Sequence, residues 1–159
     1  MRARLLVGAA ALALFLPSPA PAKLALETTP VPALETALVA KINALRARHG
    51  LRRLADSGAL ARVARAFGRQ MLAGGYFDHR RFERRLAGLS AAGENLAWFA
   101  GPASADRTVA LWLASPPHRR NLLSPVWRRV GIGAVHGLAS GGVYGYGPVT
   151  VIVADFGAP

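Results

Sequence analysis

The C-terminal part of this chain differs in residue pattern from everything before it. Residues 130–135, 142–146 and 149–156 are rich in Gly, Val, Ile and Tyr, which is typical of short strands separated by glycine turns. Residues 149–154 form a nearly continuous apolar run, as expected for a central strand covered on both faces. Because helical patterns precede these strands, the sequence predicts an α+β fold with helices packed on the faces of a small antiparallel sheet.

Three long segments before Pro116 carry apolar residues at helical spacing. The first covers residues 34–49 and is followed by the glycine stop Gly50. The second covers residues 60–71, begins at a capping Asp56 or Ser57 and ends at Gly74-Gly75, and the third covers residues 103–115. A shorter basic stretch over residues 82–89 is also predicted to be helical. His49 lies at the end of the first helix, where the helix dipole favours cations. We therefore interpret His49 as a helix-end residue and not as a ligand.

Residues 1–22 have the features of a cleavable secretory signal. Two arginines precede an apolar run over residues 5–16, and Ala20-Pro21-Ala22 provides small residues for cleavage. The run is shorter than the roughly 20 residues that span a bilayer, so a permanent membrane anchor is the weaker alternative. Residues 23–32 contain prolines without periodicity and predict a flexible leader to a domain over residues 33–159. The protein is expected to be secreted or periplasmic, with no transmembrane segment after cleavage.

The composition limits how the fold can be stabilised and which partners the protein can be expected to bind. The chain has no cysteine, so neither disulfides nor a lipid-modified cysteine can contribute. Its formal net charge is +12, spread over scattered arginine pairs. One interpretation is a solvated, arginine-rich surface, and the other is attraction to lipids or anionic cell-envelope components. Nucleic-acid binding is not expected, because export removes the usual targets and no recognition motif is present.

Two histidines and a glutamate stand where we expect helix edges or turns. His79 follows a glycine break and two aromatic residues, Glu94 lies between Gly and Asn, and His118 follows Ser-Pro-Pro. With Ser115 as the cap of a short helix, His118 falls in its first turn, where the dipole disfavours imidazolium. Two imidazoles and a carboxylate suit zinc or another divalent cation, with His79 and His118 as ligands. Two alternatives stay open from the residues alone, namely unconnected surface histidines and a Glu94 that bonds within its own turn.

Other chemistries have less support in the sequence. The chain contains neither H-E-x-x-H nor G-x-S-x-G. The glycines of residues 131–137 have the wrong spacing for a dinucleotide site, so no organic cofactor is expected. A glycosidase needs two facing carboxylates, and among only eight acidic residues Asp56 and Asp106 are assigned to helix starts.

A series of short stretches follows an order that is found in one known family. They are residues 42–46 with Gly50-Leu51, residues 60–71, Phe77-Asp78-His79, Gly93-Glu94-Asn95-Leu96-Ala97, residues 112–123, Val130-Gly131-Ile132-Gly133 and Asp155-Phe156-Gly157. In this order the chain closely resembles the CAP superfamily, the cysteine-rich secretory and pathogenesis-related type of domain, in its compact bacterial form. The stretches span nearly all of the domain.

This resemblance implies an α-β-α sandwich with a central cleft that contains His79, Glu94 and His118. In many family members a second glutamate completes the cleft, and its position corresponds to Ser115 here. Serine leaves a three-member site and weakens any acid–base chemistry that needs two carboxylates. Similar domains are associated with divalent metals in the cleft and with sterols or fatty acids elsewhere. The missing cysteines argue against transferring venom-like or ion-channel activities.

Three functional hypotheses follow. The first is a non-enzymatic module that binds lipids or envelope components and takes up a divalent cation in its cleft. The second is a metal-dependent, protease-like hydrolase that activates water at His79 and His118, with Glu94 as the base or as an orienting group. The third is a structural or stress-related envelope protein whose cleft residues are hydrogen-bonded to one another.

Overall fold

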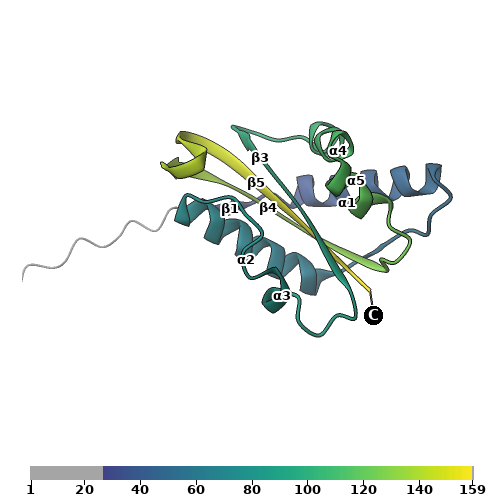
Figure 1. Cartoon of the computed structure of the whole chain (residues 1–159). Coiled ribbons are helices and arrows are strands. Elements are labelled where there is room, and N and C mark those ends of the chain that lie inside the picture. Colours follow the sequence, from purple (N-terminus) through teal and green to yellow (C-terminus); the bar gives the residue numbers. More distant parts are fainter. Residues whose placement is uncertain (1–26, 159) are drawn as a thin grey trace, which may run out of the picture.

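The computed structural model describes residues 27–158 of the chain, so the predicted signal over residues 1–22 lies outside the described residues. The helices are α1 (Pro32–Arg48), α2 (Gly58–Gly74), α3 (Phe82–Arg85), α4 (Ala105–Ala114) and α5 (Pro116–Leu123). The strands are β1 (Thr29–Pro30), β2 (Ala55–Asp56), β3 (Ala92–Ala100), β4 (Arg129–Ser140) and β5 (Tyr146–Gly157), with one 3-10 turn, η1 (Gly142–Tyr144), between the last two. Figure 1 shows how these elements are arranged.

The sheet is built around the long hairpin of β4 and β5. Its strand order is β1-β4-β5-β3, and β2 forms a short parallel pair with β4. The other pairs are antiparallel. Because β3 pairs only with β5, it forms one edge of the sheet. In this register Glu94 of β3 lies opposite Asp155 of β5.

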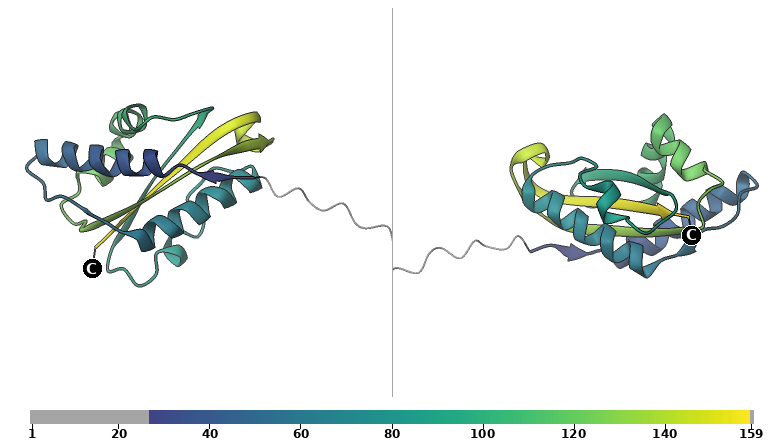
Figure 2. Two further views of the ribbon diagram at one scale, coloured as in Figure 1. Left: turned by 180° about the vertical axis from the view of Figure 1, so that it is seen from behind. Right: turned by 60° about the horizontal axis from the view of Figure 1, so that its bottom comes forward.

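Helices cover both faces of the sheet, which makes the molecule an α-β-α sandwich. Helices α1, α4 and α5 lie on one side and α2 with α3 on the other, as Figures 1 and 2 show. Alternate residues of β5 serve the two cores, since Ile152 packs with α1, α4 and α5, whereas Val151 and Val153 pack with α2. The predicted fold class and the predicted two-sided burial of β5 are both confirmed.

Glycines bring α2 very close to the sheet. Gly131 and Gly133 of β4 face the helix, and a Cβ atom added at Gly133 would lie 2.2 Å from the backbone nitrogen of Arg65. The helix is bounded as predicted, because Ser57 Oγ accepts a hydrogen bond from the Leu60 N–H at 3.4 Å. Gly75 ends it in the left-handed conformation, with φ 63°.

Several predicted elements differ from the structure. The helix predicted over residues 82–89 ends at Arg85. Residues 142–146 were expected to form a strand, but Gly141 and Gly142 have positive φ and close the hairpin as η1. Residues 92–100 were not predicted as a strand and form β3. In the predicted leader over residues 23–32, Thr29 and Pro30 pair with β4, so regular structure begins before the predicted start at residue 33.

A buried arginine joins α1 to the end of α5. The sequence places Arg46 near the C-terminus of α1, and the structure shows its side chain fully buried. It donates to the carbonyl oxygens of Arg52, Leu122 and Ser124, each at 2.9 Å. These bonds fix the C-terminal end of the helix that carries His118. Within residues 27–158, no helix combines the length and apolarity needed to cross a membrane.

Candidate functional site

The candidate site lies at the β3 edge of the sheet and is centred on Glu94. The glutamate was predicted in a turn, but it lies within β3, and its side chain is only 1% exposed. Its Oε1 atom lies 2.7 Å from His79 Nδ1, and its Oε2 atom accepts a hydrogen bond from Arg85 Nη2. Both carboxylate oxygens therefore have partners outside their own segment, and the alternative of bonding within a local turn is not realised.

A buried charge cluster lies beneath this contact and was not predicted from the sequence. Asp155 is fully buried opposite Glu94, with its Oδ2 atom 3.6 Å from Arg85 Nη1. Neither oxygen of Asp155 has a hydrogen-bond partner. Burial, with the nearby charge of Glu94, raises the pKa of Asp155 to about 8. One signal was available, because Asp155 is the only charged residue in the apolar run of β5.

Arg85 is the cation shared by the two carboxylates. Its side chain is 12% exposed, and its guanidinium carbon stands 3.6 Å above the centre of the Phe67 ring on α2. The arginine thus connects α3 with α2, β3 and β5. Nothing in the spacing of the sequence distinguishes it from Arg84, which is exposed.

His79 lies in the loop after α2 and is held by Glu94. The hydrogen bond to Glu94 raises the pKa of His79, while burial and the charge of Arg85 oppose this shift. The imidazole is 55% exposed. Because Nδ1 faces the carboxylate, the ring orientation is fixed and Nε2 is left for a ligand. A carboxylate that orients a histidine in this way is the usual support of metal-binding imidazoles.

His118 enters the site from α5. The helix begins as predicted, with Ser115 at the N-cap and Pro116 after it, although the Ser115 side chain makes no capping hydrogen bond. The Nδ1 atom of His118 is buried without a hydrogen-bond partner. Burial lowers the pKa of His118, and the charge of His79 lowers it further. The neutral ring is favoured, as expected, but burial is the main cause.

Two asparagines, which the sequence did not single out, fix α5 against β3. Asn95 Nδ2 donates to the His118 carbonyl at 3.0 Å. Asn121 Nδ2 donates to the Glu94 carbonyl at 3.0 Å and to Asn95 Oδ1 at 2.9 Å. These bonds set the position of His118 relative to Glu94. Gly93 permits the approach, because a Cβ atom there would lie 3.0 Å from Asn121 Oδ1.

The site opens into a pocket of about 340 Å³, lined by His79, Phe82, Ala92, Gly93, Glu94 and Asn121. His118 is not among the residues that line this pocket. Among the described residues, no group of three or more His, Cys, Asp or Glu side chains is arranged to hold a metal ion. Two imidazole nitrogens in this region have no hydrogen-bond partner in the structure, namely His79 Nε2 and the buried Nδ1 of His118. Glu94 is engaged in orienting His79.

The remaining two histidines have local roles. His49 lies at the C-terminal end of α1, as predicted, and is exposed. His136 Nδ1 lies 2.9 Å from Thr150 Oγ1 on the neighbouring strand. Neither contributes to the site.

Comparison with known proteins identifies the family. The model of the family described as "Cysteine-rich secretory protein family", CAP, matches residues 39–156. The chain belongs to the CAP family. Its domain is 34% identical over 131 residues to the uncharacterized protein YkwD of Bacillus subtilis, which covers 74% of this chain and 50% of that protein. The chain thus spans about half the length of this relative.

Solved structures support the CAP fold. An extracellular protein of Bacillus anthracis that contains an SCP domain matches at 26% identity with a TM-score of 0.63, over 80% of this chain and 41% of that chain. An outer surface protein of Borrelia burgdorferi matches at 19% identity with a TM-score of 0.68, over 84% of this chain and 98% of that chain. Because its sequence identity is only 19%, the likeness to the Borrelia burgdorferi protein shows the fold alone.

Proposed function

We propose that this CAP domain is an exported, non-enzymatic binding module of the cell envelope whose cleft holds a divalent cation between His79 and His118. The observation that carries the cation site is the Glu94–His79 contact of 2.7 Å, which leaves Nε2 of His79 for a ligand. The buried and unpartnered Nδ1 of His118 supplies the second donor. With only two protein ligands, water or a bound molecule would complete the coordination of zinc or a similar ion.

The hydrolase alternative lacks support. A general base needs a free carboxylate oxygen within reach of the water that it deprotonates. Both Glu94 oxygens are engaged, one by His79 and one by Arg85, and Ser115 supplies no second carboxylate.

Zinc titration by calorimetry tests the cation site. We expect one ion per chain for the wild type, and no measurable uptake for His118→Ala, because one of two protein ligands is lost. Glu94→Gln should weaken binding about 10- to 100-fold, as expected for loss of a group that orients a ligand. His49→Ala is the matched control, since this exposed histidine lies outside the site. Equal uptake by His118→Ala and His49→Ala, or none by the wild type, contradicts the proposal.

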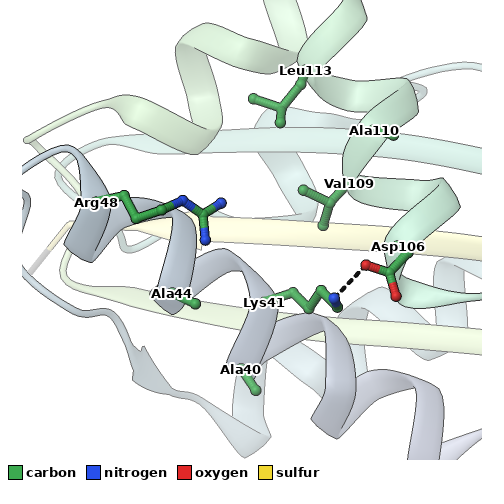
Figure 3. A pocket seen from close by; sticks show the side chains of 8 residues that line it. All are labelled: Ala40, Lys41, Ala44, Arg48, Asp106, Val109, Ala110 and Leu113. Carbon is green, nitrogen blue, oxygen red and sulfur yellow. Dashed lines mark ion pairs between the residues drawn. The ribbon is translucent and has the colours of Figure 1, made fainter.

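Other features support the proposed export and the proposed association with the cell envelope. The predicted signal and the likeness to an extracellular Bacillus anthracis protein support export. For lipids, a pocket of about 430 Å³ lies between α1 and α4 (Figure 3). Its alanines, Val109 and Leu113 provide an apolar lining, and the Lys41–Asp106 ion pair spans the two helices. Without Arg2 and Arg4 of the predicted signal, the net charge falls from +12 to about +10. Together with this positive charge, the lining suits an anionic lipid.

Vesicle sedimentation tests the lipid part. We expect binding to vesicles that contain phosphatidylglycerol, little binding to pure phosphatidylcholine, and a several-fold loss when salt rises from about 50 to about 500 mM, because screening weakens attraction between exposed charges. Ala44→Glu places a carboxylate in the pocket and should weaken binding more than Ala47→Glu, which changes the charge equally outside it. Binding that is the same for both vesicle types, or for both variants, argues against this part of the proposal.

A further inference from the structure

A groove of about 680 Å³ lies along α2. Its walls are α2 and the loop that leads into α3. Of the residues described at the site, Arg85 and the Phe67 ring that it covers also line the groove, whereas no residue that lines the pocket of His79 does. The groove is therefore separate from the pocket beside His79.

The α2 wall of the groove is mostly apolar. Val63, Ala66 and Ala73 line it together with Gln70 and Gly74, and Tyr76 adds aromatic surface, whereas the Phe67 ring is buried. A helix that packs on one sheet needs a single apolar stripe, and α2 already uses Ala64 and Met71 for that purpose. Ala66 and Ala73 are exposed, so this second apolar stripe has no partner within residues 27–158.

The opposite wall is cationic, with one arginine left unpaired. Arg80 forms an ion pair with Asp78 and stacks 4.2 Å over the Tyr76 ring. Arg85 is engaged by Glu94 and Asp155. Arg81 has no acidic partner within ion-pair distance among the described residues. An incoming anion would therefore meet a free guanidinium only at Arg81.

The backbone at Arg81 is also unusual. Its φ of 56° makes it the one non-glycine residue of the described chain in the left-handed region. A non-glycine residue in that region is uncommon, and strained backbone occurs preferentially at ligand sites. Here it places a free cation at the mouth of an apolar groove.

We infer that this groove binds a small amphipathic anion, with the apolar body of the ligand along α2 and its acidic group on Arg81. Charge complementarity determines the chemical class of the ligand, because an apolar wall alone would bind a neutral ligand equally well. A guanidinium forms charge-assisted hydrogen bonds with carboxylate, sulfonate or phosphate oxygens. A single acidic group on one apolar body matches one free arginine beside one apolar wall.

A pair of fluorescent probes tests the inference. 8-Anilinonaphthalene-1-sulfonate has one sulfonate on an aromatic body, and N-phenyl-1-naphthylamine is the same body without the sulfonate. We expect saturable, one-to-one binding of the sulfonate to the full chain. Arg81→Gly should weaken it about tenfold, which corresponds to one charge-assisted contact, and should change binding of the neutral probe less than twofold. Glycine suits a positive φ, so the melting temperature should not fall.

Two further variants complete the experiment. Arg53→Gly removes an exposed arginine elsewhere and should leave sulfonate binding unchanged, which separates a local contact from net charge. Ala66→Glu should abolish binding of both probes, whereas Ala47→Glu on the exposed surface of α1 should not. Equal sulfonate affinity for Arg81→Gly and wild type, or unchanged binding by Ala66→Glu, overturns the inference. Zinc uptake measured on the same samples distinguishes this failure from failure of the cation site.

Discussion

Replacing Arg85 with methionine is expected to lower the free energy of unfolding by about 3–5 kcal/mol at neutral pH. The change leaves Glu94 and Asp155 buried opposite each other without their shared cation. Methionine can still pack on the Phe67 ring, so lost packing would explain little of the effect. Urea denaturation followed by circular dichroism measures the loss.

The same variant should change how stability depends on pH. In the folded protein the pKa of Asp155 is raised from an ordinary value of 3.8 to about 8, so the native state keeps a proton that the unfolded chain releases. Stability from this group therefore falls as pH rises from about 4 to about 8. Without Arg85, ionising Asp155 becomes more costly, so the deficit of Arg85→Met should be larger at pH 9 than at pH 5.

Two controls separate charge from packing in this test. Arg84→Met removes an exposed arginine from the same short helix and should leave stability nearly unchanged. Adding Asp155→Asn to Arg85→Met should restore part of the stability lost at pH 9 and flatten the pH dependence, because residue 155 can then no longer ionise. If the double variant is no more stable than Arg85→Met at pH 9, the charge cluster does not cause the loss.

Replacing Gly133 with alanine is expected to lower the free energy of unfolding by about 3 kcal/mol. The added Cβ would lie 2.2 Å from the Arg65 nitrogen and 2.4 Å from the Ala64 carbonyl carbon. These are backbone atoms of α2, so no side chain can rotate away and the whole helix must move off β4. Thermal unfolding by calorimetry measures the effect.

Gly58→Ala is the matched control for Gly133→Ala. A Cβ at Gly58, the first residue of α2, meets only the Arg62 Nη1 atom at 3.9 Å. Alanine should therefore be tolerated there, and it should stabilise the protein by up to about 1 kcal/mol because it restricts the unfolded chain. Similar melting temperatures for the two variants would show that α2 does not depend on the close approach at Gly133.

Local signals account for the parts of the fold that could be predicted. Ser57 and Gly75 mark the ends of α2 through their own capping chemistry. The apolar run of β5 is typical of a buried strand and could be recognised as one. Strand β3 gave no such signal, because its first residues include Gly93 and Asn95, which favour turns. Its polar residues are buried only because partners from α3 and α5 satisfy them.

The candidate site was predictable only in part for the same reason. His79, Glu94 and His118 were singled out by their local sequence contexts, and resemblance to the CAP family grouped them in one cleft. The structure places His79 in direct contact with Glu94. Arg85 and Asp155 depend on strand register and on packing between distant segments. Helical or strand periodicity contains no information about such contacts.

The edge position of β3 affects whether copies of this protein can associate through their sheets. An exposed edge strand offers free carbonyl and N–H groups to which another chain can add a strand. On β3, the carbonyl of Glu94 accepts from Asn121 and that of Leu96 accepts from the Trp112 indole at 2.9 Å. Both side chains come from the α4–α5 layer, so the contacts that assemble the site also occupy acceptors that an aggregating strand would need. Resistance to edge-to-edge polymerisation and the geometry of the cleft thus depend on the same side of the sheet.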